Sequence, residues 1–119
     1  MLASVVCLAQ ALYYEARSEP LDGQLLVAEV VLNRVKHEDF PDTVCEVIYD
    51  ADQFSWSSNP PAMSETKELE NALKLAESIY KGETELLGSS ALYFHSGPRE
   101  GFFTTRNFLG KYGEHSFYD

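Results

Sequence analysis

Two carboxylates, an arginine and two tyrosines lie close together in the segment Tyr13-Tyr14-Glu15-Ala16-Arg17-Ser18-Glu19-Pro20. Apolar residues upstream recur at helical spacing, and Glu15 follows them at the edge of the stripe they form. We therefore expect the Glu15 side chain to be half buried. A carboxyl group that loses hydration among aromatic neighbours can keep its proton near neutrality and give it to a leaving oxygen. Glu15 is thus the candidate general acid, and the alternative is an ordinary glutamate at a helix end.

Glu19 is the candidate second carboxylate, because it lies four residues after Glu15 and shares its side if the helix continues. Cleavage of a glycosidic bond uses an acid and usually a second carboxylate. Pro20 instead favours a turn at Glu19, and a carboxylate there would cap the next helix at the positive end of its dipole. We favour this capping role. Arg17 is expected either to neutralise Glu19 or to bind an anionic group of a substrate.

The sequence motifs for other kinds of catalysis are weak or absent. The three histidines form no H-E-x-x-H motif, so a zinc site would need the distant His95 and His115 together with a carboxylate. Both histidines are more simply explained as hydrogen-bonded structural residues. No G-x-S-x-G motif, no histidine next to a cysteine and no glycine-rich phosphate loop occurs. We therefore expect neither a metal ion nor a cofactor.

Four helices are predicted from apolar residues at helical spacing, over residues 4–17, 21–36, 43–49 and 65–80. Ser4 and Ser64 are the expected caps of the first and the last helix. Thr43 and Glu46 have the spacing of a capping box. The second helix is apolar almost all round, which is typical of the buried centre of a small domain.

Polar side chains interrupt this central helix at Glu29 and Arg34, and each needs a partner if it is buried. We expect them to pair with neighbouring helix ends. After the last helix the pattern changes, and residues 91–96 and 102–109 are predicted as short strands. The end of the chain, residues 115–118, is expected to pack back on the core. The sequence thus predicts a single α+β domain over residues 1–119, mostly helical, with a short antiparallel β element near the C-terminus.

The loop after residue 51 carries Gln53-Phe54-Ser55-Trp56, with the only tryptophan of the chain. Phe54 and Trp56 have two alternative roles. They can plug the core beneath the loop, or they can form a platform on which the C–H faces of a sugar stack. The sequence leaves both open.

Composition excludes several classes of partner. The net charge is −10, and the nine Lys and Arg residues are scattered, so neither nucleic acid nor an anionic membrane is an expected partner. No run of about 18 apolar residues is present to span a membrane. The apolar N-terminus lacks a basic region, so we assign it to the domain and expect any export signal to precede Met1. Cys7 and Cys45 are either buried thiols or one disulfide that would stabilise the fold by about 3–4 kcal/mol.

Several blocks of the chain together resemble the SleB/CwlJ-type cell wall hydrolases, which include spore cortex-lytic enzymes. They come in the family's order and cover nearly the whole chain: Cys7-Leu8-Ala9, Tyr14 to Pro20, Gly23-Gln24, Val27-Ala28, Val30 to Val35, Phe40 to Cys45, Gln53 to Trp56, Ala91 to His95 and Gly113 to Tyr118.

The resemblance implies a small lysozyme-like fold and cleavage of the peptidoglycan glycan strand between N-acetylmuramic acid and N-acetylglucosamine. It places the family's catalytic glutamate on Glu15. The product is expected to be a 1,6-anhydro end, as from a lytic transglycosylase, or a reducing end, as from a muramidase. The residues expected to contact the sugars are Gln53, Phe54, Ser55, Trp56, Tyr93 and His95.

Two other functions remain open at this point. One is a non-catalytic module that binds peptidoglycan, and the other is a zinc-dependent amidase that cuts the stem peptide. In each case the expected partner is peptidoglycan, and the expected site of action is the cell wall, the periplasm or the extracellular space. We expect a monomer. A role in germination, in division or in phage lysis is equally compatible with the sequence.

Overall fold

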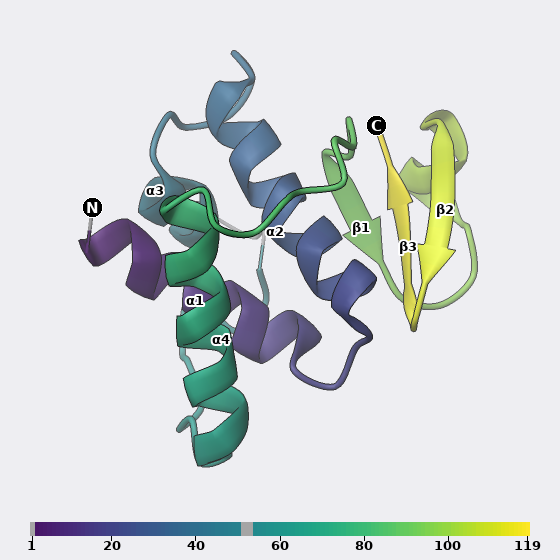
Figure 1. The fold of residues 1–119 in the computed structure, drawn as a ribbon. Helices are drawn as coiled ribbons and strands as arrows, with labels where there is room; N and C mark the ends of the chain where they lie inside the picture. Colours follow the sequence, from purple (N-terminus) through teal and green to yellow (C-terminus); the bar gives the residue numbers. More distant parts are fainter. Residues whose placement is uncertain (1, 51–53) are drawn as a thin grey trace.

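The computed structural model describes residues 2–50 and 54–119. Its helices gather on one side and a small sheet lies at the other (Figure 1). In chain order the elements are α1 (Leu2–Ala16), α2 (Leu21–Lys36), α3 (Val44–Tyr49), α4 (Thr66–Tyr80), β1 (Tyr93–His95), the 3-10 helix η1 (Gly101–Thr105), β2 (Phe108–Tyr112) and β3 (His115–Tyr118). The predicted α+β class, mostly helical with a short antiparallel sheet near the C-terminus, is confirmed.

The core forms where α1 packs against the other three helices. The helix α2 has the predicted bounds, and its apolar residues are buried on nearly every side. Leu8 of α1, Val27 of α2 and Ile48 of α3 are fully buried. Removing this much apolar surface from water is what holds the helices together. It also fixes the C-terminal turn of α1, where Glu15 lies.

Two predicted helix caps are wrong. The helix α1 already begins at Leu2, so Ser4 lies inside it. The helix α4 is capped at Glu65 rather than Ser64, and no side chain accepts a capping hydrogen bond there. The predicted cap at Thr43 is confirmed, because its Oγ1 accepts the Glu46 N–H at 3.2 Å, and the same hydroxyl donates to the Glu46 carboxylate at 2.8 Å. This difference has a physical reason: this cap needs only local contacts, whereas the start of α4 depends on α1.

Glu29 and Arg34 of α2 are both buried, and the partners of Glu29 lie in the segment before β1 rather than at a helix end. Glu29 is 2% exposed and accepts the backbone N–H groups of Leu87 (2.8 Å) and Ser89 (2.6 Å). Arg34 donates its Nε–H to the carbonyl of Leu92 at 2.8 Å. These contacts tie the segment from residue 87 to residue 92 to α2 and so fix the start of β1.

The sheet differs from the prediction in its second and third strands. The strand order is β1-β3-β2, with both pairs antiparallel, so the C-terminal segment is the central strand. Residues 102–109 do not form one strand, because residues 102–105 belong to η1 and β2 begins only at Phe108. In η1, Thr104 and Thr105 each donate a side-chain hydrogen bond to the carbonyl three residues earlier. Such local bonds compete with strand pairing, and apolar content alone did not reveal them.

A disulfide joins Cys7 of α1 to Cys45 of α3, with their Cα atoms 5.3 Å apart. Of the two alternatives left by the sequence, the structure has the bridge. Within residues 2–50 and 54–119, no helix combines the length and the apolar character needed to cross a bilayer.

Candidate active site

Glu15 lies in the last turn of α1 and is half-buried, as its position at the edge of the apolar stripe predicts. It lines a cavity of about 350 Å³, which we call the Glu15 cavity. This volume falls within the range of small-molecule sites, about 300–1,000 Å³. The other lining residues are Arg34, Phe54, Ser55, Phe94, His95, Ser96 and His115. The cavity therefore lies where α1, the loop after residue 53, and the sheet meet.

The indole of Trp56 holds the Glu15 carboxylate. Its Nε1–H donates to Glu15 Oε1 at 2.9 Å. Tyr14 stacks on the same indole, with ring centroids 4.6 Å apart, and donates its hydroxyl to the carbonyl of Pro61. Burial raises the pKa of the Tyr14 hydroxyl, so this group keeps the proton that it donates. One orientation of the Glu15 side chain is thus selected by its neighbour in sequence and by the loop.

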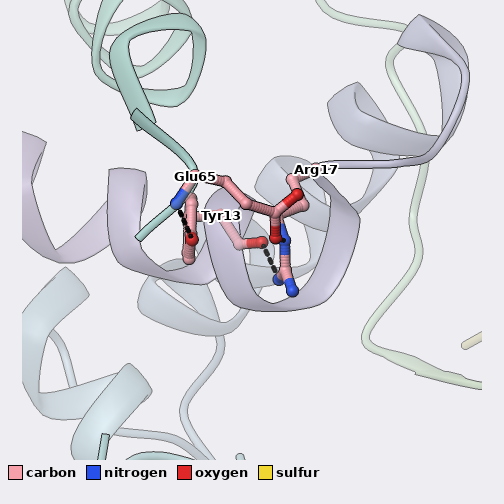
Figure 2. A network of polar contacts seen from close by, with 3 residues as sticks. All are labelled: Tyr13, Arg17 and Glu65. Atoms are coloured by element: carbon pink, nitrogen blue, oxygen red, sulfur yellow. Dashed lines mark hydrogen bonds and ion pairs between the residues drawn. The ribbon is translucent and has the colours of Figure 1, made fainter. Parts of the chain in front are cut away.

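A second set of contacts anchors the far end of this loop to α1, and Figure 2 shows Tyr13 and Arg17 facing Glu65. The Tyr13 hydroxyl accepts the Glu65 N–H at 3.1 Å, and Arg17 Nε pairs with the Glu65 carboxylate. Arg17 also donates to the carbonyl of Tyr13 at 2.9 Å. The prediction that Arg17 neutralises Glu19 is therefore wrong. Its ion pair instead fixes the start of α4 against the turn of α1 that carries Glu15.

Glu19 does not cap α2, because the N-cap is Pro20 and no side chain accepts a capping hydrogen bond. Its carboxylate accepts the Glu114 N–H, at 3.1 Å to one oxygen and 3.3 Å to the other. The same carboxylate lies 3.3 Å from His115 Nδ1, and both side chains are nearly buried. Glu19 thus joins the turn after α1 to the β2–β3 turn. Sequence reasoning missed this link because it spans most of the chain.

The predicted sugar-contacting residues do not all lie at the Glu15 cavity. Ser55 and His95 line the Glu15 cavity beside Phe54, whose ring is 3% exposed and belongs to the core. Trp56 is connected to the cavity by its hydrogen bond to Glu15, which lines it. Tyr93 lines a neighbouring cavity instead. Gln53 lies outside the described residues.

The two histidines considered for zinc line the same cavity, but each is engaged elsewhere. His95 Nε2 is 2.8 Å from the Tyr118 hydroxyl, and its ring stacks on Phe103. His115 faces Glu19. In the part of the chain that the structure describes, no three His, Cys, Asp or Glu side chains are grouped so that they could hold a metal ion.

Four lining residues were not among the predicted site residues: Arg34, Phe94, Ser96 and His115, the last of which was considered only for zinc or for a structural role. Arg34 is buried, and desolvation lowers the pKa of its guanidinium, although Tyr93 and Asp50 oppose this shift. The sequence did contain a signal for Arg34, because an arginine within an otherwise apolar helix needs a polar partner. Without the fold, however, it indicated a structural partner as readily as a cavity wall.

The α+β fold and a half-buried carboxyl group in a cavity between helices and sheet define a small enzyme domain. The chain belongs to the cell wall hydrolase family, whose model matches residues 18–118. The predicted resemblance and the assignment as an enzyme are thereby confirmed at the level of the family. Glu15 lies just before the matched segment, so its role depends on the geometry described above.

Two spore cortex-lytic enzymes share short, similar segments with this chain. The one from Oceanobacillus iheyensis is 50% identical over 48 residues, which are 40% of this chain and 17% of that protein. The one from Bacillus subtilis is 51% identical over 43 residues, which are 36% of this chain and 14% of that protein. The matches thus span only a small part of each relative.

Two solved structures are similar over the whole chain. One is the catalytic domain of the germination-specific lytic transglycosylase SleB from Bacillus anthracis, with a TM-score of 0.75 and 28% identity over 100% of this chain and 96% of that domain. The other is the catalytic domain of the Bacillus cereus SleB protein, with a TM-score of 0.73 and 28% identity over 100% of this chain and 91% of that domain.

Proposed function

We propose that the chain cleaves the glycan strand of peptidoglycan between N-acetylmuramic acid and N-acetylglucosamine, with Glu15 as its single catalytic carboxyl group. The observation that carries the proposal is the Trp56 hydrogen bond to Glu15 Oε1 inside the Glu15 cavity. In the protonated acid, Oε1 accepts the indole N–H as a carbonyl oxygen. The Oε2 hydroxyl then remains as the proton donor for the glycosidic oxygen.

The reaction that we favour is transglycosylation. Glu15 gives its proton to the bridging oxygen as the bond from C1 of the muramoyl sugar breaks. The C6 hydroxyl of the same sugar then bonds to C1 and returns its proton to the Glu15 carboxylate. One carboxyl group is enough for this cycle, since no water is consumed and no external base is needed. The name of the Bacillus anthracis neighbour, a lytic transglycosylase, supports this choice over hydrolysis.

Substrate capture should rest on stacking and hydrogen bonds. With a net charge of −10, the domain does not attract an anionic wall polymer electrostatically. Ser55 and His95 are candidates for contacts to hydroxyl and N-acetyl groups, because both line the Glu15 cavity. In this proposal Glu19 is a positioning residue for His115 rather than a second catalytic carboxylate.

The proposed site of action is the cell wall or another space outside the cytoplasm. The Cys7–Cys45 disulfide supports this location, because disulfides persist mainly in oxidising compartments. The agreement with an isolated catalytic domain over 100% of the chain supports residues 1–119 acting as one catalytic domain. We further propose that this domain acts as a monomer.

Glu15→Gln tests the assignment. The amide keeps the shape and can still accept the indole N–H, but it cannot donate and recover a proton, so release of soluble fragments from purified peptidoglycan should fall at least about a hundredfold. Mass spectrometry of the products checks the reaction, since an anhydro end and a reducing end differ by one water. Glu100→Gln, at an exposed position, is the matched control for the loss of charge. Wild-type rates in Glu15→Gln would refute the role of Glu15.

A further inference from the structure

A second cavity, of about 480 Å³, adjoins the Glu15 cavity. Its lining residues are Arg34, Asp39, Phe40, Tyr93, Phe94, Phe102 and Phe103, and we call it the aromatic pocket. Arg34 and Phe94 line both cavities. The two cavities also meet at a stacked pair of rings. His95 lines the Glu15 cavity and Phe103 lines the aromatic pocket, and their ring centroids are 3.8 Å apart with the ring planes at 6°. The two cavities are therefore adjacent parts of one surface.

Aromatic rings dominate this pocket, and not all of them are covered. Phe102 of η1 is 46% exposed, and its ring meets Tyr93 edge-to-face at 5.0 Å. Tyr93 in turn lies 6.1 Å from the ring of Phe40. The electron-rich faces of such rings attract the C–H groups of a pyranose.

Among the described residues, two guanidinium groups and one carboxylate lie at this pocket, and the Arg106 guanidinium is 4.6 Å from the centroid of the Phe102 ring and 5.1 Å from that of Tyr93. Arg34 donates to the carbonyl of Leu92, and its guanidinium lies 4.9 Å from the centroid of the Phe40 ring. It is thus built into the wall instead of being held out as a carboxylate clamp. Asp39 presents a carboxylate that is 76% exposed. This group accepts hydrogen bonds from hydroxyl or N-acetyl N–H donors.

We propose that the aromatic pocket binds an N-acetylhexosamine unit of the glycan strand, next to the sugars joined by the cleaved bond. This inference rests on the proposed function, because a polymer held across the Glu15 cavity must continue along the adjoining surface. Phe102 supplies the exposed ring on which the sugar stacks. Asp39 accepts a hydrogen bond from the same sugar.

Binding of a neutral N-acetylglucosamine hexamer, measured by titration calorimetry, tests the pocket. The measurement uses the Glu15→Gln protein, so it needs no turnover and does not depend on whether Glu15 is catalytic. Adding Phe102→Ala should weaken binding of the hexamer about tenfold, because one stacking surface is lost. Adding Phe102→Trp should restore the affinity, since it replaces the aromatic face.

Phe108→Ala is the matched control. Phe108 of β2 is 50% exposed, close to the value for Phe102, and it lines neither cavity. Its replacement should leave binding of the hexamer unchanged. Equal affinities with and without Phe102→Ala, an equal loss in Phe108→Ala, or no binding of the hexamer at all would each overturn the subsite. Retained lysis by Glu15→Gln would instead overturn the proposed function and leave the binding result standing.

Discussion

At Glu15, the hydrogen bond from Trp56 is the contact most directly coupled to the proposed chemistry. The indole both supplies a donor and stacks on Tyr14, so its two functions can be separated by substitution. A phenyl ring keeps an aromatic face for stacking and removes the N–H, together with part of the ring surface. The geometry of the carboxyl group would then depend on the cavity walls alone.

Trp56→Phe should therefore lower kcat up to about tenfold while KM changes little, because a hydrogen bond to the neutral acid contributes about 0.5–1.5 kcal/mol and about 1.4 kcal/mol is tenfold in rate. Initial rates on purified glycan strands at several concentrations give the two constants. The melting temperature reports whether the loop stays in place. An unchanged kcat with an intact fold would show that the indole N–H does not orient Glu15.

At the scale of elements, the site depends on how the turn after α1 meets the β2–β3 turn. Glu19 accepts the Glu114 N–H and faces His115, which lines the Glu15 cavity. Gly113 permits the close approach of the β2–β3 turn to Glu19 and Pro20. It has a φ of 61°, and a Cβ atom there would lie 2.2 Å from a Glu19 carboxylate oxygen and 2.9 Å from Pro20 Cδ.

Gly113→Ala should destabilise the fold by more than the cost of left-handed backbone, which is about 1–2 kcal/mol. The additional loss of stability arises because the Pro20 ring cannot move away from the new methyl group. The Glu19 carboxylate must also move and lose its hydrogen bond to the Glu114 N–H. Gly101→Ala is the control, since Gly101 has a φ of 55° with open space around it. Urea denaturation of both variants measures the difference. If both lost the same free energy of unfolding, the contact with Glu19 and Pro20 would be unimportant.

For the whole molecule, the disulfide is the one covalent tie between distant elements that the described residues show. It joins α1 to α3 across a sequence separation of 38 residues. Such a link lowers the entropy of the unfolded chain more than it alters the folded one. Cys7 lies about two helical turns before Glu15 on the same helix, so the bridge stabilises the element that carries the carboxyl group.

Replacing both Cys7 and Cys45 with serine should lower the free energy of unfolding by about 4 kcal/mol on the loop-entropy estimate. Calorimetric melting of the variant measures the loss. Reduction of the wild-type protein should produce a similar shift, whereas the same reductant should leave the double variant unchanged. Equal melting temperatures of oxidised and reduced wild-type protein would contradict a stabilising bridge.

Local patterns in the sequence determined the helices and the position of Glu15. The bounds of α2 and the cap at Thr43 were predictable, because helical hydrogen bonds and capping contacts close within a few residues. The half-buried state of Glu15 followed from its place beside an apolar stripe. Ser55 and His95 were also among the predicted residues, and the structure gathers both in the Glu15 cavity.

Only the tertiary structure decided which side chains meet across the chain. Glu19 and Glu114 are 95 residues apart, Arg17 and Glu65 are 48 apart, and no local periodicity links either pair. The central place of β3 likewise depends on strand pairing between segments that the sequence pattern does not link. Helices are specified by neighbours in sequence, but a cavity is specified by which elements pack together, and that packing is set by the whole core.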